Sequence, residues 1–194
     1  MLEKKKVLSS HSGVFGGEIN GRPLRYFTML RSPLERVISF WLHAVRDPSN
    51  VAHEKAIKYS FAEFIEGQFF TDTHNYQTRL VAGVNSLEGL SESEYLYKKI
   101  TETELSIAKE NLIGLFDFVG IQEQFYYSFT GISNLLGLPL VGSKPRKVAH
   151  ASQRQASNLS KRDLEIVFEA NKLDMELYSF ATQLFKKSCK KIKF

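Results

Sequence analysis

The sequence predicts an α/β fold in which a parallel sheet of few strands is flanked by many helices. Short apolar runs rich in β-forming residues stand at 26–30 and 116–121, which is typical of buried strands. A segment with helical apolar spacing follows each run after a short turn. Strands that alternate with helices favour parallel pairing. At 194 residues, the chain suits a single domain, 1–194, with a sizeable core.

A further strand is expected at 7–10, and a glycine-rich loop follows at 11–21. Residues 16–21 have the G-x-x-x-x-G spacing of a phosphate-binding loop. However, Arg22 and Pro23 stand where such a loop needs lysine and then serine or threonine. We therefore do not interpret this stretch as a nucleotide loop.

The stretch around which the chain is organised runs from the strand at 26–30 into a helix. Ser32 and Glu35 have the S-x-x-E spacing of a capping box. Pro33 takes the first helical position, where its missing N–H costs nothing. The apolar stripe of this helix consists of Leu34, Val37, Ile38, Trp41 and Val45.

Arg31 stands at the carboxyl end of this strand, directly before the helix. Open α/β sheets bind ligands at this end, and the amides of a helix N-terminus favour anions. Arg36, Ser39 and His43 share another face of the helix. A guanidinium and a hydroxyl so placed would hold a phosphate group. The alternative is that Arg31 and Arg36 are ordinary surface charges and that Ser39 only fills a helix position.

The segment F-T-M-L-R-S-P-L-E-R-V-I-S-F at 27–40 resembles the 3′-phosphate-binding segment of the PAPS-dependent sulfotransferases. It is most similar to the carbohydrate-type group that includes heparan sulfate 2-O-sulfotransferase. The resemblance implies a P-loop-NTPase-like parallel sheet, PAPS as the sulfuryl donor and PAP as the product. It also implies that Arg31 and Ser39 hold the 3′-phosphate, with Arg36 in support.

The same resemblance extends to two other parts of the chain. His11 stands near the place of a family histidine that is a candidate general base, although the usual preceding glycine is missing. The segment H-N-Y-Q-T-R-L-V-A-G at 74–83 resembles one that borders the acceptor cleft, which implies acceptor contacts from Asn75, Gln77 and Arg79. The alternatives are a loop histidine of no consequence and a helix with a polar side.

A basic loop follows in the last third of the chain. Residues 144–162 contain six lysines and arginines and no acidic residue. Loops on a rigid scaffold often carry binding residues, so this concentration of positive charge favours a loop that covers a phosphate. In the resembled family a basic loop closes over the nucleotide. The cofactor-binding candidates here are Lys144, Arg146, Lys147 and Arg154.

The remaining elements are expected to be helices. Ser60 and Glu63 form a capping box before a helix that runs through Phe69, and Ser160 and Asp163 cap another. Residues 88–110 alternate in charge and indicate a solvated helical face. The aromatic helix at 123–136 is expected to pack into the core, and 171–185 resembles the closing helix of the family.

The charge of the chain lies mostly at its ends. The formal net charge is +5, of which residues 1–6 carry +2 and the basic tail at 186–194 carries +5, which leaves −2 for the rest. A nucleic-acid-binding body would more often show a basic face, so no nucleic-acid partner is expected. With the single cysteine Cys189, no apolar signal core and no membrane-spanning run, we expect a cytoplasmic protein. The five histidines show no metal-ligand spacing.

One part of the resembled family is missing from the sequence: its first strand and the P-K-x-G-[ST]-[ST] loop that cradles the 5′-phosphosulfate. The missing strand would lie between those at 26–30 and 116–121. These two strands are therefore expected to pair directly, or a partner chain fills the gap, which makes a homo-oligomer an open expectation.

Three functions stay open from the sequence. The first is sulfuryl transfer from PAPS to an acceptor hydroxyl, possibly on a carbohydrate. The second is PAP binding without catalysis. The third is an interaction module whose basic tails bind an anionic surface.

Overall fold

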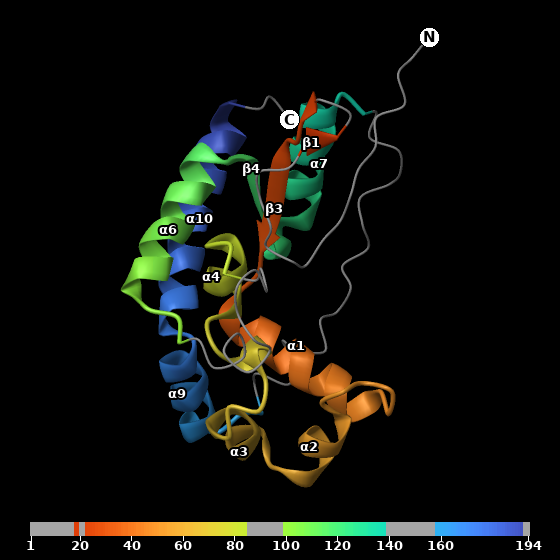
Figure 1. The fold of residues 1–194 in the computed structure, drawn as a ribbon. Helices are drawn as coiled ribbons and strands as arrows, with labels where there is room; N and C mark the ends of the chain where they lie inside the picture. Colours follow the sequence, from red (N-terminus) through yellow and green to blue (C-terminus); the bar gives the residue numbers. More distant parts are fainter. Residues whose placement is uncertain (1–17, 20–21, 85–98, 139–157, 192–194) are drawn as a thin grey trace.

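The computed structural model describes residues 18–19, 22–84, 99–138 and 158–191 (Figure 1). Its strands are β1 (Glu18–Ile19), β2 (Arg22–Pro23), β3 (Tyr26–Leu30) and β4 (Phe116–Ile121). Its α-helices are α1 (Pro33–Arg46), α2 (His53–Lys58), α3 (Phe61–Glu66), α4 (Tyr76–Val81), α6 (Glu102–Gly114), α7 (Phe125–Leu136), α9 (Lys161–Ala170) and α10 (Lys172–Lys191). Two short 3₁₀ turns are η1 (Thr71–Thr73) and η2 (Gln122–Gln124).

β3 and β4 pair directly and in parallel. The register runs from Phe27 opposite Phe118 to Leu30 opposite Ile121. Asp117 fixes the start of the pair, because its carboxylate accepts the Tyr26 amide at 3.2 Å and pairs with the Arg25 guanidinium at 2.8 Å. The expectation of direct pairing is thus confirmed, and so is a mixed α/β fold with a small parallel sheet. β1 and β2 form a separate antiparallel pair.

Helices cover both sides of the β3–β4 pair. In Figure 1, α7 lies on one side of the strands, and α6 and the long α10 lie on the other. α7 approaches β4 closely, because a Cβ added at Gly131 would lie 2.3 Å from the Phe118 ring. The core between these elements includes Leu30, Leu105, Leu112, Phe118, Val119, Ile121, Leu177 and Phe185. Burial of this apolar surface is the main favourable term for the fold.

α1 extends from the carboxyl end of β3 into a helical region made with α2, α3 and α9 (Figure 1). Val37 and Ile38 are fully buried against Phe61, Ile65 and Val167, and Leu34 and Trp41 pack around this cluster. Val45 packs against a second cluster around Ala44 and Phe64. The predicted apolar stripe of this helix is therefore confirmed, as is Pro33 at its first position.

The predicted capping box at the start of α1 is wrong. The Ser32 side chain makes no capping hydrogen bond, and Glu35 instead approaches the Arg31 guanidinium. The Ser32 amide donates to Glu123 Oε1 at 2.8 Å, so a carboxylate from the end of β4 caps the helix. A partner so far away in the sequence replaces the local one because parallel pairing brings the two strand ends together. The capping boxes at Ser60 and Ser160 are confirmed.

Other helical expectations also need correction. α3 ends at Glu66 rather than at Phe69, since Gly67 caps it and Gln68 has a positive φ of 49°. The described part of 88–110 is not simply a solvated face, because α6 buries one side of its helix against α4 and α10.

The aromatic residues of α7 do not form the expected core stripe. Phe125, Tyr127 and Phe129 are 42%, 45% and 45% exposed. The helix packs against β4 with its small residues Ser128 and Gly131, and its Ile132 belongs to the core.

Several predicted residues lie outside the described part of the chain. These are the strand at 7–10, His11, residues 85–98 and the basic-loop candidates Lys144, Arg146, Lys147 and Arg154. Among the described helices, none is long and apolar enough to cross a bilayer.

Candidate functional site

A cavity of about 500 Å³ lies at the carboxyl ends of the two parallel strands. β3 contributes the residues that lead up to Arg31, and Gln122 follows β4 directly. We call it the strand-end cavity. Its lining is Thr28, Met29, Leu30, Arg31, Arg36, Phe40, Asp72, Tyr76, Gln77, Leu80, Val81 and Gln122.

The backbone of Arg31 is fixed by the side chain of Gln77. The Arg31 amide donates to Gln77 Oε1 at 2.9 Å, and Gln77 Nε2 donates to the Arg31 carbonyl at 2.9 Å. This two-way pairing takes the place of a neighbouring strand at the end of β3. The Arg31 side chain is 19% exposed, and its Nη2 lies 3.6 Å from the Glu35 carboxylate. Gln77 thus positions Arg31 at the cavity.

Arg36 is a largely buried cation one turn into α1. Its Nη2 donates to the Asp72 carbonyl, and the guanidinium lies 5.2 Å from the Tyr76 ring centroid. Within the described residues, its buried Nε has no hydrogen-bond partner. Burial lowers the pKa of Arg36, while Asp174 and Asp72 oppose this shift. The positive charge of Arg31 lowers the pKa of Arg36 further, so the two guanidiniums repel each other.

Ser39, the predicted hydroxyl partner of Arg31, is not among the residues that line this cavity. Phe40 lines it instead, one helical turn beyond Arg36. The structure therefore brings Arg31 together with Arg36 and Gln77, whereas the sequence paired Arg31 with Ser39.

The segment from η1 to α4 contributes residues to the strand-end cavity and to a second one. Asp72, Tyr76, Gln77 and Leu80 line the first. The alternate residues Thr71, His74, Asn75 and Arg79 line a cavity of about 780 Å³ between α4 and α9, which we call the α4–α9 cavity. The three acceptor-site candidates are thus divided, with Gln77 on one side and Asn75 and Arg79 on the other.

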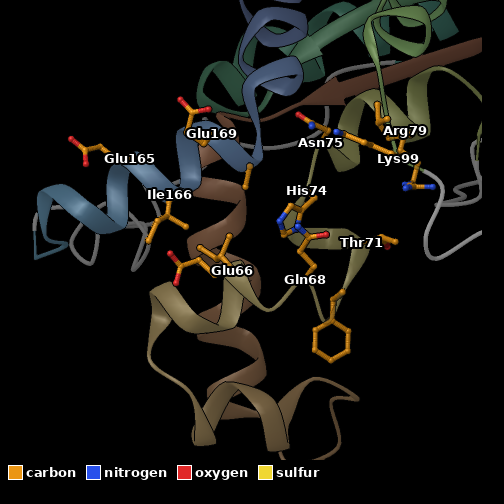
Figure 2. A pocket seen from close by; sticks show the side chains of 14 residues that line it. Glu66, Gln68, Thr71, His74, Asn75, Arg79, Lys99, Glu165, Ile166 and Glu169 are labelled. Carbon is orange, nitrogen blue, oxygen red and sulfur yellow. The ribbon is translucent and has the colours of Figure 1, made fainter.

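The α4–α9 cavity has an acidic and a basic side (Figure 2). Glu66 of α3 and Glu165 and Glu169 of α9 lie on one side. Arg79 and Lys99 lie on the other. The rest of the lining is Ile65, Gln68, Phe70, Thr71, His74, Asn75, Ile100, Ile166 and Ala170.

Reciprocal capping holds the segment between the cavities in place. Asn75 Oδ1 accepts the amides of Leu173 and Asp174 at 3.0 and 3.1 Å, which caps α10. The Asp174 carboxylate accepts the amides of Gln77 and Thr78 at 3.0 and 2.7 Å, which caps α4. The Asn75 amide oxygen is therefore engaged in structure. Asparagine and aspartate are both common at helix N-termini. The sequence does not show, however, that Asn75 caps α10 and that Asp174 caps α4.

Glu123 is a site residue that the sequence did not single out. Its Oε1 accepts the Ser32 amide, and its Oε2 accepts the Tyr178 hydroxyl at 2.9 Å. Burial and this carboxylate raise the pKa of Tyr178. One carboxylate thereby ties the end of β4 to α1 and α10, which fixes the helix that carries Arg36. No local motif marks such a residue.

The chemistry that the two cavities offer is anion binding by guanidiniums and hydrogen bonding by a mixed polar lining. Within the described residues, no group of three or more histidine, cysteine or acidic side chains is placed to hold a metal ion. Comparison of the chain with protein-family models, with curated proteins and with solved structures finds no match. The function is therefore inferred from the geometry of the site.

Proposed function

We propose that the chain is a PAPS-dependent sulfotransferase domain that binds the 3′-phosphate of the donor in the strand-end cavity. One observation carries the proposal: two arginines from different elements, Arg31 and Arg36, line one cavity at the carboxyl ends of parallel strands. This is the edge at which open α/β sheets bind ligands. Guanidinium groups suit phosphate because they donate paired hydrogen bonds.

The residues present fit a phosphate group. A buried donor without a partner costs about 1–3 kcal/mol, and Arg36 Nε is such a donor within the described residues. An anion between the two guanidiniums would offset their mutual repulsion and accept from this donor. Gln77 would hold Arg31 in position through the paired bonds to its backbone.

The donor supplies an activated sulfuryl group, and transfer of such a group depends mainly on positioning and on stabilisation of spread charge. In this proposal Arg31 and Arg36 bind the 3′-phosphate and thereby orient the donor. Arg79 and Lys99 offer positive charge in the α4–α9 cavity, where the acceptor hydroxyl would lie. His11, Lys144, Arg146, Lys147 and Arg154 remain predictions from the resemblance, whereas Ser39 does not line the strand-end cavity.

The second candidate is PAP binding without transfer. The sequence contains no P-K-x-G-[ST]-[ST] segment. The donors that such a loop gives to the leaving oxygens would then have to come from other residues. Under this alternative the strand-end cavity binds PAP just as well, but no sulfuryl group is moved.

Calorimetric titration with PAP tests the cavity. We expect native protein to bind PAP more tightly than 5′-AMP, and Arg31→Ala to weaken PAP binding at least tenfold without changing 5′-AMP binding. The matched control is Arg46→Ala, because Arg46 is an exposed arginine on the same helix whose Nε donates to the Leu42 carbonyl and which does not line the strand-end cavity. PAP affinity that is equal in native and Arg31→Ala protein contradicts both candidates.

Transfer of labelled sulfate from PAPS then separates the two candidates. Turnover supports the transferase. PAP binding that depends on Arg31, without turnover on any acceptor, supports the binding protein.

A further inference from the structure

The α4–α9 cavity separates its charges by sign. Its carboxylates come from α3 and α9 and lie on one side, and Arg79 and Lys99 lie on the other (Figure 2). Its volume of about 780 Å³ falls in the range of roughly 300–1,000 Å³ that is usual for small-molecule sites. A ligand here would bind independently of the donor, so its identity goes beyond either candidate function.

The acidic side lies at the end of α9, where a cation is favoured. Glu165 and Glu169 stand four residues apart, so they share one face of the helix and repel each other. α9 ends at Ala170, which also lines the cavity, and its last turn carries no basic residue. The C-terminal end of a helix carries partial negative charge, which adds to that of Glu169. An ammonium group of a ligand would offset both.

The ion pairs of these carboxylates leave them accessible to a ligand. Glu66 lies 3.5 Å from Arg162, and Glu165 lies 3.6 Å from Lys161. Glu66 and Glu165 are 46% and 62% exposed in these pairs. Exposed pairs of this kind contribute little to stability, so they can exchange with another partner. Glu169 belongs to neither pair and is exposed.

The basic side combines a buried cation with an exposed one. Arg79, in the last turn of α4, is 4% exposed, whereas Lys99 is an exposed residue. Guanidinium and ammonium groups bind carboxylates through charge-assisted hydrogen bonds. An anionic group of a ligand is therefore favoured at this side.

The lining between the two sides is apolar or neutral. It includes Ile65, Ile100 and Ile166. His74 also lines the cavity, and burial lowers its pKa, as does the positive charge of Arg36 to a smaller extent (Figure 2). The imidazole is therefore mostly neutral at pH 7. An apolar chain suits this part of the cavity, whereas a polyanion would meet the carboxylates of α3 and α9.

We propose that the α4–α9 cavity binds a small zwitterion of the amino acid class. Its ammonium group lies at the carboxylates of α3 and α9, and its anionic group lies at Arg79 and Lys99. An apolar chain joins the two ends and packs against the isoleucines. A ligand with a single charge would engage only one side of the cavity.

The first test compares zwitterions with matched ligands that carry one charge. Chemical-shift titration of the ¹⁵N-labelled full chain measures the Kd of γ-aminobutyrate, ε-aminocaproate and ω-aminocaprylate, which differ in the distance between their charged ends. Caproate and hexylamine each lack one of these charges. We expect at least one zwitterion to bind about tenfold more tightly than caproate or hexylamine, because only a zwitterion engages both sides.

The second test locates the zwitterion with one substitution on each side. Glu169→Gln should weaken zwitterion and hexylamine binding but leave caproate binding unchanged. Lys99→Gln should weaken zwitterion and caproate binding but leave hexylamine binding unchanged. Glu54→Gln and Lys187→Gln are the matched controls, because both residues are exposed and neither lines the cavity. Thermal unfolding checks that each variant is folded.

Each contrary result has a distinct meaning. If no zwitterion binds more tightly than caproate and hexylamine, the cavity does not select opposite charges and the proposal is wrong. Zwitterion binding that neither Glu169→Gln nor Lys99→Gln weakens would place the ligand elsewhere and contradict the proposal as well. PAP titration reports on the strand-end cavity separately, so PAP binding that does not depend on Arg31 would contradict the proposed function alone.

Discussion

Arg36 is a residue whose charge the fold disfavours. Its guanidinium is buried, repelled by Arg31 and incompletely hydrogen-bonded within the described residues. The pKa of Arg36 is lowered because burial outweighs the attraction of Asp174 and Asp72. The charged side chain is therefore less favourable in the folded protein than in the unfolded chain. Such strain is common where a site must be ready for a ligand.

We predict that Arg36→Met leaves the free energy of unfolding unchanged or raises it by about 1–2 kcal/mol, since a buried charge gives way to an apolar chain of similar length. Urea denaturation at neutral pH measures this. The same variant should lose PAP binding. A loss of stability greater than about 1 kcal/mol would show that the contacts with Asp72 and Tyr76 outweigh the desolvation cost.

At the scale of elements, the reciprocal caps decide how α4 and α10 meet. Asn75 has a positive φ of 47° and caps α10, while Asp174 caps α4. Asparagine adopts this left-handed conformation more easily than most residues. The backbone conformation and the cap thus both favour asparagine at position 75. Structural needs alone account for this residue, and no ligand contact has to be invoked.

We predict that the two contributions of Asn75 can be separated by two substitutions. Asn75→Gly loses the cap but adopts the backbone freely, so it should cost about 1 kcal/mol. Asn75→Ala also carries the strain of a left-handed backbone and should cost about 2 kcal/mol or more. Urea denaturation compares the two, with Ser160→Ala at an exposed capping box as a control of about 1 kcal/mol. Equal costs for the two variants would mean that the backbone conformation carries no strain.

At the scale of the whole molecule, two features leave surface for association. Within the described residues, β3 and β4 form a pair with one unpaired edge on each strand. α7 exposes Phe125 and Phe129, whose rings stack at 5.9 Å between centroids. Unpaired strand edges and exposed aromatic groups both favour contact with another chain.

We predict that the isolated chain self-associates in a concentration-dependent manner, as sedimentation velocity would show. Phe129→Glu distinguishes the two surfaces. Association that persists in this variant points to the strand edges, and association that disappears points to the aromatic face of α7. A stable monomer over the whole concentration range would contradict the prediction.

The sequence determined the local structure well because its signals are local. The strand at 26–30, the proline at the first position of α1, and the capping boxes at Ser60 and Ser160 depend on neighbours a few residues apart. The position of Arg31 at a strand end followed from the same periodicity. Direct pairing of β3 with β4 was one of the two alternatives that the sequence left open, and the structure shows which one holds.

Only the tertiary structure decided which side chains share a site. Glu123 replaced Glu35 as the partner of Ser32, and Gln77 fixed Arg31, across more than forty residues of sequence in each case. Arg36 rather than Ser39 joined Arg31 at one cavity, and Asn75 and Asp174 capped each other's helices. The physical reason is that helix and strand periodicity sets which residues share a face. Packing between elements then sets which faces meet, and contacts of that range leave no pattern along the chain.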